Sequence, residues 1–193
     1  MLNHCGTVTL QTPRLVLRPL CLDDAPDMYA HWANDPAVTR YLRWEPHRTW
    51  AETAELLYEW SRHYTDPTYY QWGICEKDSG VLFGSISLCP GEEDPAWGPL
   101  AEGGPLWEPG YCLGRRWWGQ GYAAEALCAV RDLWFDRVGG VRLACCHAAE
   151  NEASGAVMRK AGFRYHHDSV YHKFNGTAVP CRVYLLQRGE KNG

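Results

Sequence analysis

The sequence contains no apolar run that approaches the roughly 20 residues a helix needs to cross a lipid bilayer. Its first residues, MLNHCGTVTLQTPR, lack the charged start and the apolar stretch of a secretory signal. Basic residues are not in excess, because the formal net charge is −4, which argues against a nucleic-acid-binding surface. We therefore expect a cytoplasmic protein that binds neither membranes nor nucleic acids.

The nine cysteines include no C-x-x-C pair, and their odd number speaks against a disulfide framework. Cys145 and Cys146 are neighbours, so in a strand their side chains point to opposite faces. The same geometry separates His166 from His167. Buried thiols in a reducing compartment are the simplest interpretation, and we expect no bound metal.

The composition, 46% hydrophobic and 22% charged, is typical of a folded chain, and 193 residues suffice for a single domain, 1–193, with a tail at 188–193. Residues 89–106 are rich in proline, glycine and acids and predict a long surface loop. Periodicity, caps and turn signals predict, before this loop, a strand at 15–20, helices at 23–34 and from Thr49, and a hairpin over 69–75 and 81–88. After the loop they predict a strand at 107–113, a helix at 123–137, a strand at 141–148, a helix at 151–161 and a hairpin over 163–174 and 177–187. This order indicates an α/β (α+β) fold of about seven strands with helices packed on a mixed sheet.

A glycine-containing turn, R-R-W-W-G-Q-G-Y, lies between the predicted strand at 107–113 and the helix that follows. Gly119 and Gly121 have no Cβ atoms, so a ligand can approach their backbone closely. The first N–H groups of the helix and the positive end of its dipole favour an anion such as a pyrophosphate. A tight turn without a ligand stays open as the alternative.

Two other nucleotide motifs fit this turn poorly. A P-loop requires Lys-Ser or Lys-Thr after its last glycine, and neither follows here. A dinucleotide fingerprint matches at Gly119, Gly121 and Ala124, but the motif lies beyond the middle of the chain and the next strand does not end in an acid.

The run W-W-G-Q-G-Y-A-A-E-A resembles the coenzyme A pyrophosphate loop of the GNAT acetyltransferases, Q/R-x-x-G-x-G/A. The resemblance places the cofactor phosphates at Trp118, Gly119, Gln120, Gly121, Tyr122 and Ala123. Trp118 replaces the usual Gln or Arg and offers an indole N–H without a charge. Arg115 and Arg116 could supply the charge, and a frame that begins at Arg116 also matches the pattern.

A second segment, E-N-E-A-S-G-A-V-M-R-K-A-G-F at 150–163, resembles the N-x-x-S-x-x-x-x-x-K-x-G-F pattern of the same superfamily. Within that superfamily it resembles the branch typified by ribosomal-protein-alanine N-acetyltransferases. The segments at 12–19, 34–42 and 109–113 resemble the same branch in the same order. The resemblance therefore covers nearly the whole chain.

The resemblance implies a mostly antiparallel sheet with helices on both faces, and acetyl-coenzyme A as the acyl donor. It also implies that Asn151 bonds the pantetheine arm and that Ser154 lies near the thioester sulfur, although both residues would also cap a helix. Many members carry a tyrosine acid seven residues after this Asn, where this chain has Met158, so Ser154 is the nearest substitute. The strand bulge of the family places an oxyanion donor at a backbone N–H near Cys112 or Leu113.

In this superfamily a neutral amine attacks the thioester directly, so a general base accelerates the reaction. Glu108 is the first candidate and His147 the second, while a purely structural role is open for each. The acceptor is a primary amine of a protein N-terminus or a small molecule. Acids at Glu45 and at 92–94 are expected to attract it. The alternative function is a non-catalytic acyl-coenzyme A-binding sensor or scaffold, and a homodimer is left open.

Overall fold

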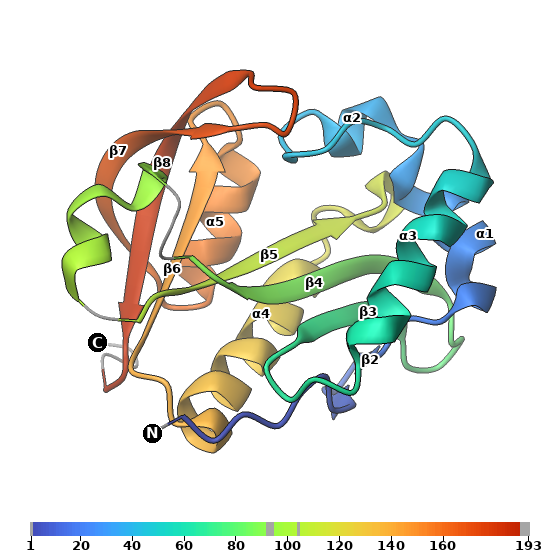
Figure 1. Cartoon of the computed structure of the whole chain (residues 1–193), viewed down its shortest axis with the longest axis horizontal. Coiled ribbons are helices and arrows are strands. Elements are labelled where there is room, and N and C mark those ends of the chain that lie inside the picture. Colours follow the sequence, from blue (N-terminus) through green and yellow to red (C-terminus); the bar gives the residue numbers. More distant parts are fainter. Residues whose placement is uncertain (1, 92–94, 104, 190–193) are drawn as a thin grey trace.

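The computed structural model describes residues 2–91, 95–103 and 105–189. Within these residues eight strands form two sheets, with the strand orders β1-β2-β3-β4-β5 and β6-β8-β7. The two sheets meet where β5 contacts β6 (Figure 1). The expected α/β class is confirmed, whereas the expected sheet of about seven strands is two sheets with eight strands.

The five-stranded sheet is antiparallel throughout. β2 (Leu15–Arg18) pairs with the two-residue strand β1 (Leu10–Gln11) on one side and with β3 (Tyr70–Glu76) on the other. β4 (Leu82–Pro90) and β5 (Trp107–Leu113) complete it. The first expected hairpin is confirmed as β3 and β4, and β1 was not expected because two residues carry no periodicity.

The three-stranded sheet consists of β6 (Arg142–Ala148), β7 (Arg164–His172) and β8 (Ala178–Gln187), also paired antiparallel. β7 and β8 form the expected hairpin around Asn175 and Gly176. Gly176 has a φ of 86°, and Asn175 Oδ1 accepts the backbone N–H of the residue that follows this glycine. This is the side-chain and left-handed turn chemistry for which Asn-Gly is preferred.

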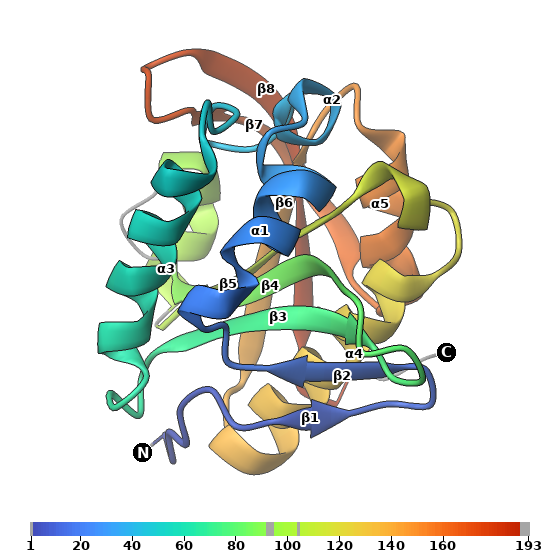
Figure 2. The same ribbon diagram turned by 90° about the vertical axis from the view of Figure 1, so that its right-hand side faces the viewer.

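One face of the five-stranded sheet is covered by α1 (Ala25–Met28) and α3 (Trp50–His63) (Figure 2). The expected helix at 23–34 is a continuous helical segment in which η1 (Leu22–Asp24) precedes α1 and η2 (Tyr29–Ala33), a π-helical turn, follows it. The short helix α2 (residues 36–39) comes next. Thr49 caps α3 as expected, since its Oγ1 accepts the N–H of Glu52 at 3.3 Å.

The opposite face is covered by α4 (Tyr122–Asp132), which continues as the π-helical η5 (Leu133–Val138). Beside α4, α5 (Glu152–Lys160) packs on β6. Gly139, with a φ of 84°, ends η5, and Asn151 caps α5. The expected capping role of Asn151 is thus confirmed. Helices in the described part of the chain are each too short or too polar to cross a membrane.

The main core lies between the sheets and this second layer of helices. Trp107 of β5 and Trp134 of η5 are buried, and their ring centroids are 4.8 Å apart. Leu127 of α4 and Met158 of α5 are buried in the same cluster. Burial of each such side chain contributes about 1.5–3 kcal/mol, so these contacts hold α4 and α5 firmly against β5 and β6.

The stretch at 89–106 differs from the expected surface loop. β4 extends to Pro90, and η3 (Pro95–Gly103) is a 3-10 helical segment. Its residues Ala96, Trp97 and Leu100 are buried against the three-stranded sheet. These apolar side chains hold η3 against the three-stranded sheet, although the composition of the segment is typical of loops.

Candidate functional site

The segment that joins β5 to α4 forms a tight loop, which we call the glycine loop (residues 118–123). Gly119 and Gly121 have φ angles of 74° and 83°, in the left-handed region that side chains rarely adopt. Gly121 is the N-cap of α4, so the N–H groups of Tyr122 and Ala123 have no acceptor within the helix. These N–H groups and the helix dipole together form an anion-binding arrangement.

Trp118 stabilises the glycine loop rather than offering its indole to a ligand. Its Nε1–H donates to the carbonyl of Leu113 at 2.7 Å, although about 48% of the residue is exposed. Gln120 donates to the carbonyl of Arg116 at 2.9 Å. Arg115 forms an ion pair with Asp35 at 2.5 Å. The expected donor of Trp118 and the expected charge of Arg115 are therefore already used by the protein.

Arg14 is a residue of the site that sequence reasoning missed. Its guanidinium donates to the carbonyl of Gln120 at 3.0 Å, forms an ion pair with Glu125 at 2.7 Å and lies 4.4 Å from the ring centroid of Tyr122. A Cβ atom on Gly121 would lie 3.5 Å from Arg14 Nη2. Arg14 thus brings a positive charge to the glycine loop from the β1–β2 turn. The segment that contains Arg14 was noticed only as a family likeness, and nothing local indicates its partner.

Glu125, in the first turn of α4, is held ionised by this arrangement. Partial burial raises the pKa of its carboxyl, but hydrogen bonds from Thr12 at 2.6 Å and from Arg14 outweigh that effect, and the pKa is lowered. A negative charge in the first turn also interacts favourably with the helix dipole. The charge of Glu125 is paired, so it does not cancel the attraction of the helix end for an anion.

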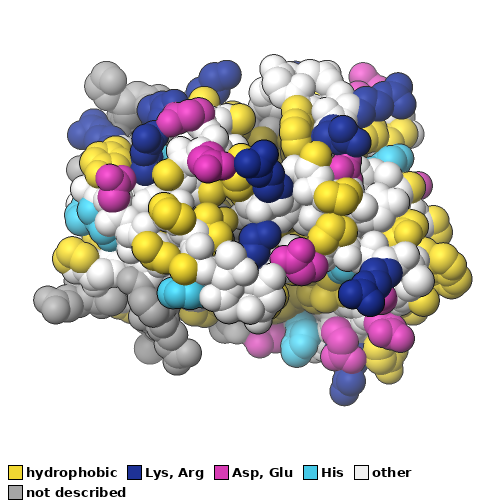
Figure 3. All heavy atoms as spheres, turned by 90° about the horizontal axis from the view of Figure 1, so that it is seen from above, with side chains coloured by type: hydrophobic (Ala, Val, Ile, Leu, Met, Phe, Trp, Pro, Cys, Tyr) yellow, Lys and Arg dark blue, Asp and Glu magenta, His cyan; other side chains and the backbone are white. Residues whose placement is uncertain are grey.

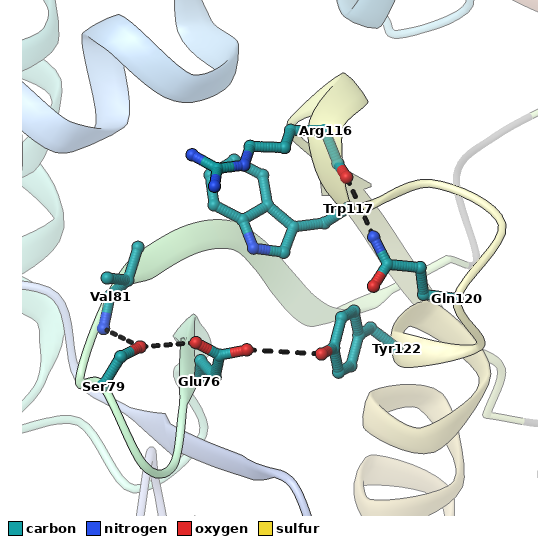
Figure 4. Close-up of a pocket in the computed structure, with 7 residues that line it drawn as sticks. All are labelled: Glu76, Ser79, Val81, Arg116, Trp117, Gln120 and Tyr122. Atoms are coloured by element: carbon teal, nitrogen blue, oxygen red, sulfur yellow. Dashed lines mark hydrogen bonds between the residues drawn. The ribbon is translucent and has the colours of Figure 1, made fainter.

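A cleft of about 400 Å³ borders the glycine loop (Figure 4). Tyr122 donates to Glu76 at 3.3 Å, and Trp117 stacks on Phe83 with ring centroids 5.1 Å apart. The cleft is lined by Glu76, Ser79, Val81, Arg116, Trp117, Gln120 and Tyr122. A second hollow of about 260 Å³ shares Arg116 and Trp117. The loop is therefore open to solvent on this side.

The edge of β5 that faces β6 carries backbone groups that do not pair with β4. The N–H of Gly114 donates to the carbonyl of Phe83 in β4. Because the direction of backbone groups alternates along a strand, the N–H of Cys112 points to β4 and the N–H of Leu113 points to the side of β6. β5 and β6 contact each other but belong to different sheets. The N–H of Leu113 and that of Tyr111 therefore point into the gap between the two strands.

The bulge expected near Cys112 and Leu113 is not found. Residues 84–90 and 107–113, all of which the structure describes, pair in one unbroken register. The N–H of Leu113 points away from β4 instead because β5 is the last strand of its sheet. Of the two expected oxyanion donors, the N–H of Cys112 is directed at β4 and the N–H of Leu113 is directed away from it.

Asn151 and Ser154 lie at the start of α5, across the gap from β5. Asn151 Oδ1 accepts the N–H of Ser154 at 3.2 Å, so the capping role is observed. Ser154 Oγ lies 2.8 Å from the hydroxyl oxygen of Tyr111, and the same hydroxyl oxygen lies 3.1 Å from the Ser154 carbonyl oxygen. Met158 is buried in the core and cannot donate a proton. The hydroxyl pair of Tyr111 and Ser154 was not expected.

Glu108 lies on the other face of β5 from Tyr111, because the two residues are three positions apart in a strand. Its side chain is near Cys146 of β6, with 3.9 Å between Cys146 Sγ and Glu108 Oε1. Glu108 is half-buried and is paired in register with Cys89. The two candidate groups, Glu108 and Ser154, thus approach the gap from opposite faces.

His147, the second candidate base, lies beneath α5. It is 3% exposed, and a Cβ atom on Gly155 would lie 2.6 Å from its Nε2. Its Nδ1 is 2.8 Å from the carbonyl of Ala148, so Nδ1 carries the proton of the neutral ring. Burial lowers the pKa of His147 despite this hydrogen bond. A diffusing amine has no direct path to this ring.

Of the acids expected to attract an acceptor, only Glu45 lies among the described residues. Glu45 is engaged by the β7–β8 hairpin: it lies 3.6 Å from Lys173 Nζ and accepts from Asn175 at 3.0 Å. Basic and acidic side chains are interspersed over the surface seen in Figure 3. Glu92, Glu93 and Asp94 lie outside the described residues. The charge of Glu45 is thus largely compensated by Lys173.

Metal chemistry was not expected. Among residues 2–91, 95–103 and 105–189, no three side chains of the metal-binding types are grouped to hold an ion.

Comparison with known proteins identifies the family to which this chain is similar. A family model described as an acetyltransferase (GNAT) domain matches residues 14–164. The uncharacterized N-acetyltransferase YoaA of Bacillus subtilis strain 168 is 28% identical over 180 residues, which cover 92% of this chain and 95% of YoaA.

Solved structures show the same fold. An acetyltransferase of the GNAT family from Bacillus anthracis matches with a TM-score of 0.76 at 18% identity, covering 96% of this chain and 100% of that one. A ribosomal-protein-S5-alanine acetyltransferase from Vibrio fischeri matches with a TM-score of 0.70 at 16% identity and the same coverage. At such identities the likeness concerns the fold alone.

Proposed function

We propose that this chain, which belongs to the GNAT acetyltransferase family, moves an acetyl group from acetyl-coenzyme A to a primary amine by direct attack of the amine on the thioester. The chain is an acyltransferase, and members of the family use acetyl-coenzyme A. One observation carries the proposal: the glycine loop and Ser154 both contact β5, through the bond of Trp118 to the Leu113 carbonyl and the contact of Ser154 with Tyr111.

The glycine loop would hold the pyrophosphate of the cofactor. The left-handed glycines Gly119 and Gly121 allow close approach, and the first N–H groups of α4 supply donors. Arg14, which is paired with Glu125, places its guanidinium beside Gly121 and bonds the Gln120 carbonyl. Asn151 uses Oδ1 as a cap, which leaves its amide N–H groups for the pantetheine arm.

The reacting thioester would lie in the gap between β5 and β6. The N–H of Leu113 points into this gap and is our candidate for the donor that stabilises the developing oxyanion. Ser154 Oγ is our candidate for the group that donates a hydrogen bond to the leaving sulfur. Both interactions strengthen as negative charge develops, so they lower the barrier more than they tighten substrate binding.

Glu108 is our candidate for the base. An α-amino group has a pKa of about 7.7–8.0 and a lysine-type amine about 10.4, so a base that removes the amine proton matters near neutral pH. Glu108 lies on the face of β5 opposite to Tyr111 and Ser154. An amine approaching from that face would meet the base on one side and the thioester on the other.

The acceptor we propose is the amine of a protein N-terminus or of a small molecule. The test is a panel of peptide N-termini, polyamines and aminoglycoside-type amines, each mixed with acetyl-coenzyme A while free thiol is measured. Release that depends on one amine class supports the proposal and names the acceptor. Binding of acetyl-coenzyme A without amine-dependent release by any class would favour the sensor function instead.

A further inference from the structure

Tyr111 and Ser154 form a hydroxyl pair across the gap between β5 and α5. The two oxygens are 2.8 Å apart, and the phenol also lies 3.1 Å from the Ser154 carbonyl oxygen. One partner belongs to the strand that enters the glycine loop and the other to the first turn of α5. The position of Ser154 Oγ is therefore set by a residue 43 positions earlier in the chain.

The two hydroxyl groups share two protons, which allows two arrangements. If Tyr111 donates to the Ser154 carbonyl, the proton of Ser154 points at the phenol oxygen. If Tyr111 donates to Ser154 Oγ, the proton of Ser154 is free to point elsewhere. In the second arrangement the phenol also polarises the serine hydroxyl, because hydrogen bonds in a chain strengthen one another.

Burial raises the pKa of Tyr111 well above its ordinary value. The phenol consequently keeps its proton throughout the neutral range and stays a donor. It is suited to hold a hydrogen bond and unsuited to give its proton away.

We propose that Tyr111 is a positioning residue that donates to Ser154 Oγ and thereby directs the Ser154 proton at the sulfur of the leaving thiolate. The inference rests on the proposed role of Ser154. In the step itself the amine nitrogen forms a bond to the acetyl carbon, the carbon–sulfur bond breaks, and its electron pair goes to sulfur. The amine proton passes to the base and then to solvent, and the thiolate takes a proton from water on release. Tyr111 loses no proton.

Tyr111→Phe tests the proposal because phenylalanine keeps the ring and removes only the hydroxyl. We expect kcat to fall about 5- to 10-fold, the equivalent of one hydrogen bond that is stronger in the transition state, and the KM for acetyl-coenzyme A to change less than about twofold. Tyr165→Phe is the matched control, since Tyr165 is exposed on β7 and contacts the ring of Tyr184. The control should leave both constants unchanged.

A double-mutant cycle with Ser154→Ala separates positioning from a merely structural role. We expect Tyr111→Phe to have little further effect on kcat once Ser154 is alanine. An equal loss of kcat in both backgrounds would overturn the proposal, as would a Tyr111→Phe enzyme as active as the parent. If Ser154→Ala itself retains full kcat, the role of Ser154 fails first and the inference fails with it.

A fluorinated tyrosine at position 111 keeps the test decisive if Tyr111→Phe does not fold. Its phenol is more acidic and is therefore a stronger hydrogen-bond donor. We expect kcat to rise in the parent background and to stay unchanged in Ser154→Ala. An unchanged kcat in the parent background, or an equal change in both backgrounds, would contradict the positioning role.

Discussion

Arg14 and Glu125 are 111 residues apart in the sequence, yet Arg14 Nη2 and Glu125 Oε2 lie 2.7 Å apart and form an ion pair. The pair ties the β1–β2 turn to the first turn of α4, and Thr12 adds a hydrogen bond to the same carboxylate. Arg14 also donates to the carbonyl of Gln120 within the glycine loop. The N-terminal strands thus help to set the conformation of the candidate cofactor loop.

Arg14→Gln should therefore weaken binding of acetyl-coenzyme A. The side chain is about 46% exposed, so the ion pair alone is worth at most about 1 kcal/mol, but the charge beside Gly121 and the bond to Gln120 are lost with it. We expect the Kd measured by calorimetry to rise about tenfold. Arg62→Gln, which removes an exposed arginine of α3, is the control. An unchanged Kd in Arg14→Gln would mean that the loop needs no such support.

Gly121→Val should abolish binding of acetyl-coenzyme A. Valine is strained at a φ of 83°, and its side chain would occupy the space where the phosphates are proposed to lie. Gly176→Val is the control for backbone strain, because Gly176 has a φ of 86° in the β7–β8 turn and no atom within 4 Å of its missing Cβ. Both variants should lose similar stability, as judged by thermal unfolding, while the control binds normally. Full binding by Gly121→Val would refute the placement of the phosphates.

Glu108→Gln should reduce kcat/KM most strongly at low pH, where most of the amine is protonated and a base is most needed. A base of this kind typically contributes about 10²–10⁴-fold in rate. The measurement is a pH–rate profile of the variant beside the parent and Glu55→Gln, which alters an exposed acid of α3. A profile whose shape does not change would remove Glu108 as the base.

Asp24→Asn should lower the free energy of unfolding by about 1.5–3 kcal/mol, the range for hydrogen bonds to charged groups. Burial raises the pKa of Asp24, but bonds from Arg18 at 2.7 Å and 2.8 Å and from the Cys21 N–H outweigh it, and the pKa is lowered. A lowered pKa means stability that is present above pH about 4 and lost as the pH falls through the folded value.

The difference between parent and Asp24→Asn should accordingly shrink in denaturant titrations below that pH. Glu59→Gln, whose partner Arg62 is 3.8 Å away on the surface, should cost less than about 0.5 kcal/mol. A difference that does not depend on pH would show that the charge of Asp24 is not what stabilises the fold.

Most of the fold follows from local sequence. Thr49, Asn151, Gly139 and the Asn175-Gly176 pair mark element ends through interactions within a few residues, and the structure places each element end there. The glycine loop is also local, since its two glycines and the following helix are contiguous. Such features depend on backbone geometry that a short segment determines by itself.

The rest depends on contacts between distant segments. Arg14 meets Glu125, and Tyr111 meets Ser154, only because tertiary packing brings separate elements together. Trp97 is buried because η3 packs on the three-stranded sheet. The composition of the segment gives no sign of this packing. The division into two sheets is likewise visible only in the tertiary structure, where β5 and β6 are in contact but unpaired.

The central claim is that the amine attacks the thioester without an acetylated enzyme. The test measures the protein mass, the N-acetylated amine and the free thiol in the same sample, by mass spectrometry and a thiol assay. The protein is mixed with acetyl-coenzyme A alone, and then with the amine that the acceptor panel selects. We predict no thiol release and no change in the protein mass without amine, and equal amounts of free thiol and N-acetylated amine with it. An acetyl group on the protein in the absence of amine, chased into product on adding amine, would contradict direct attack.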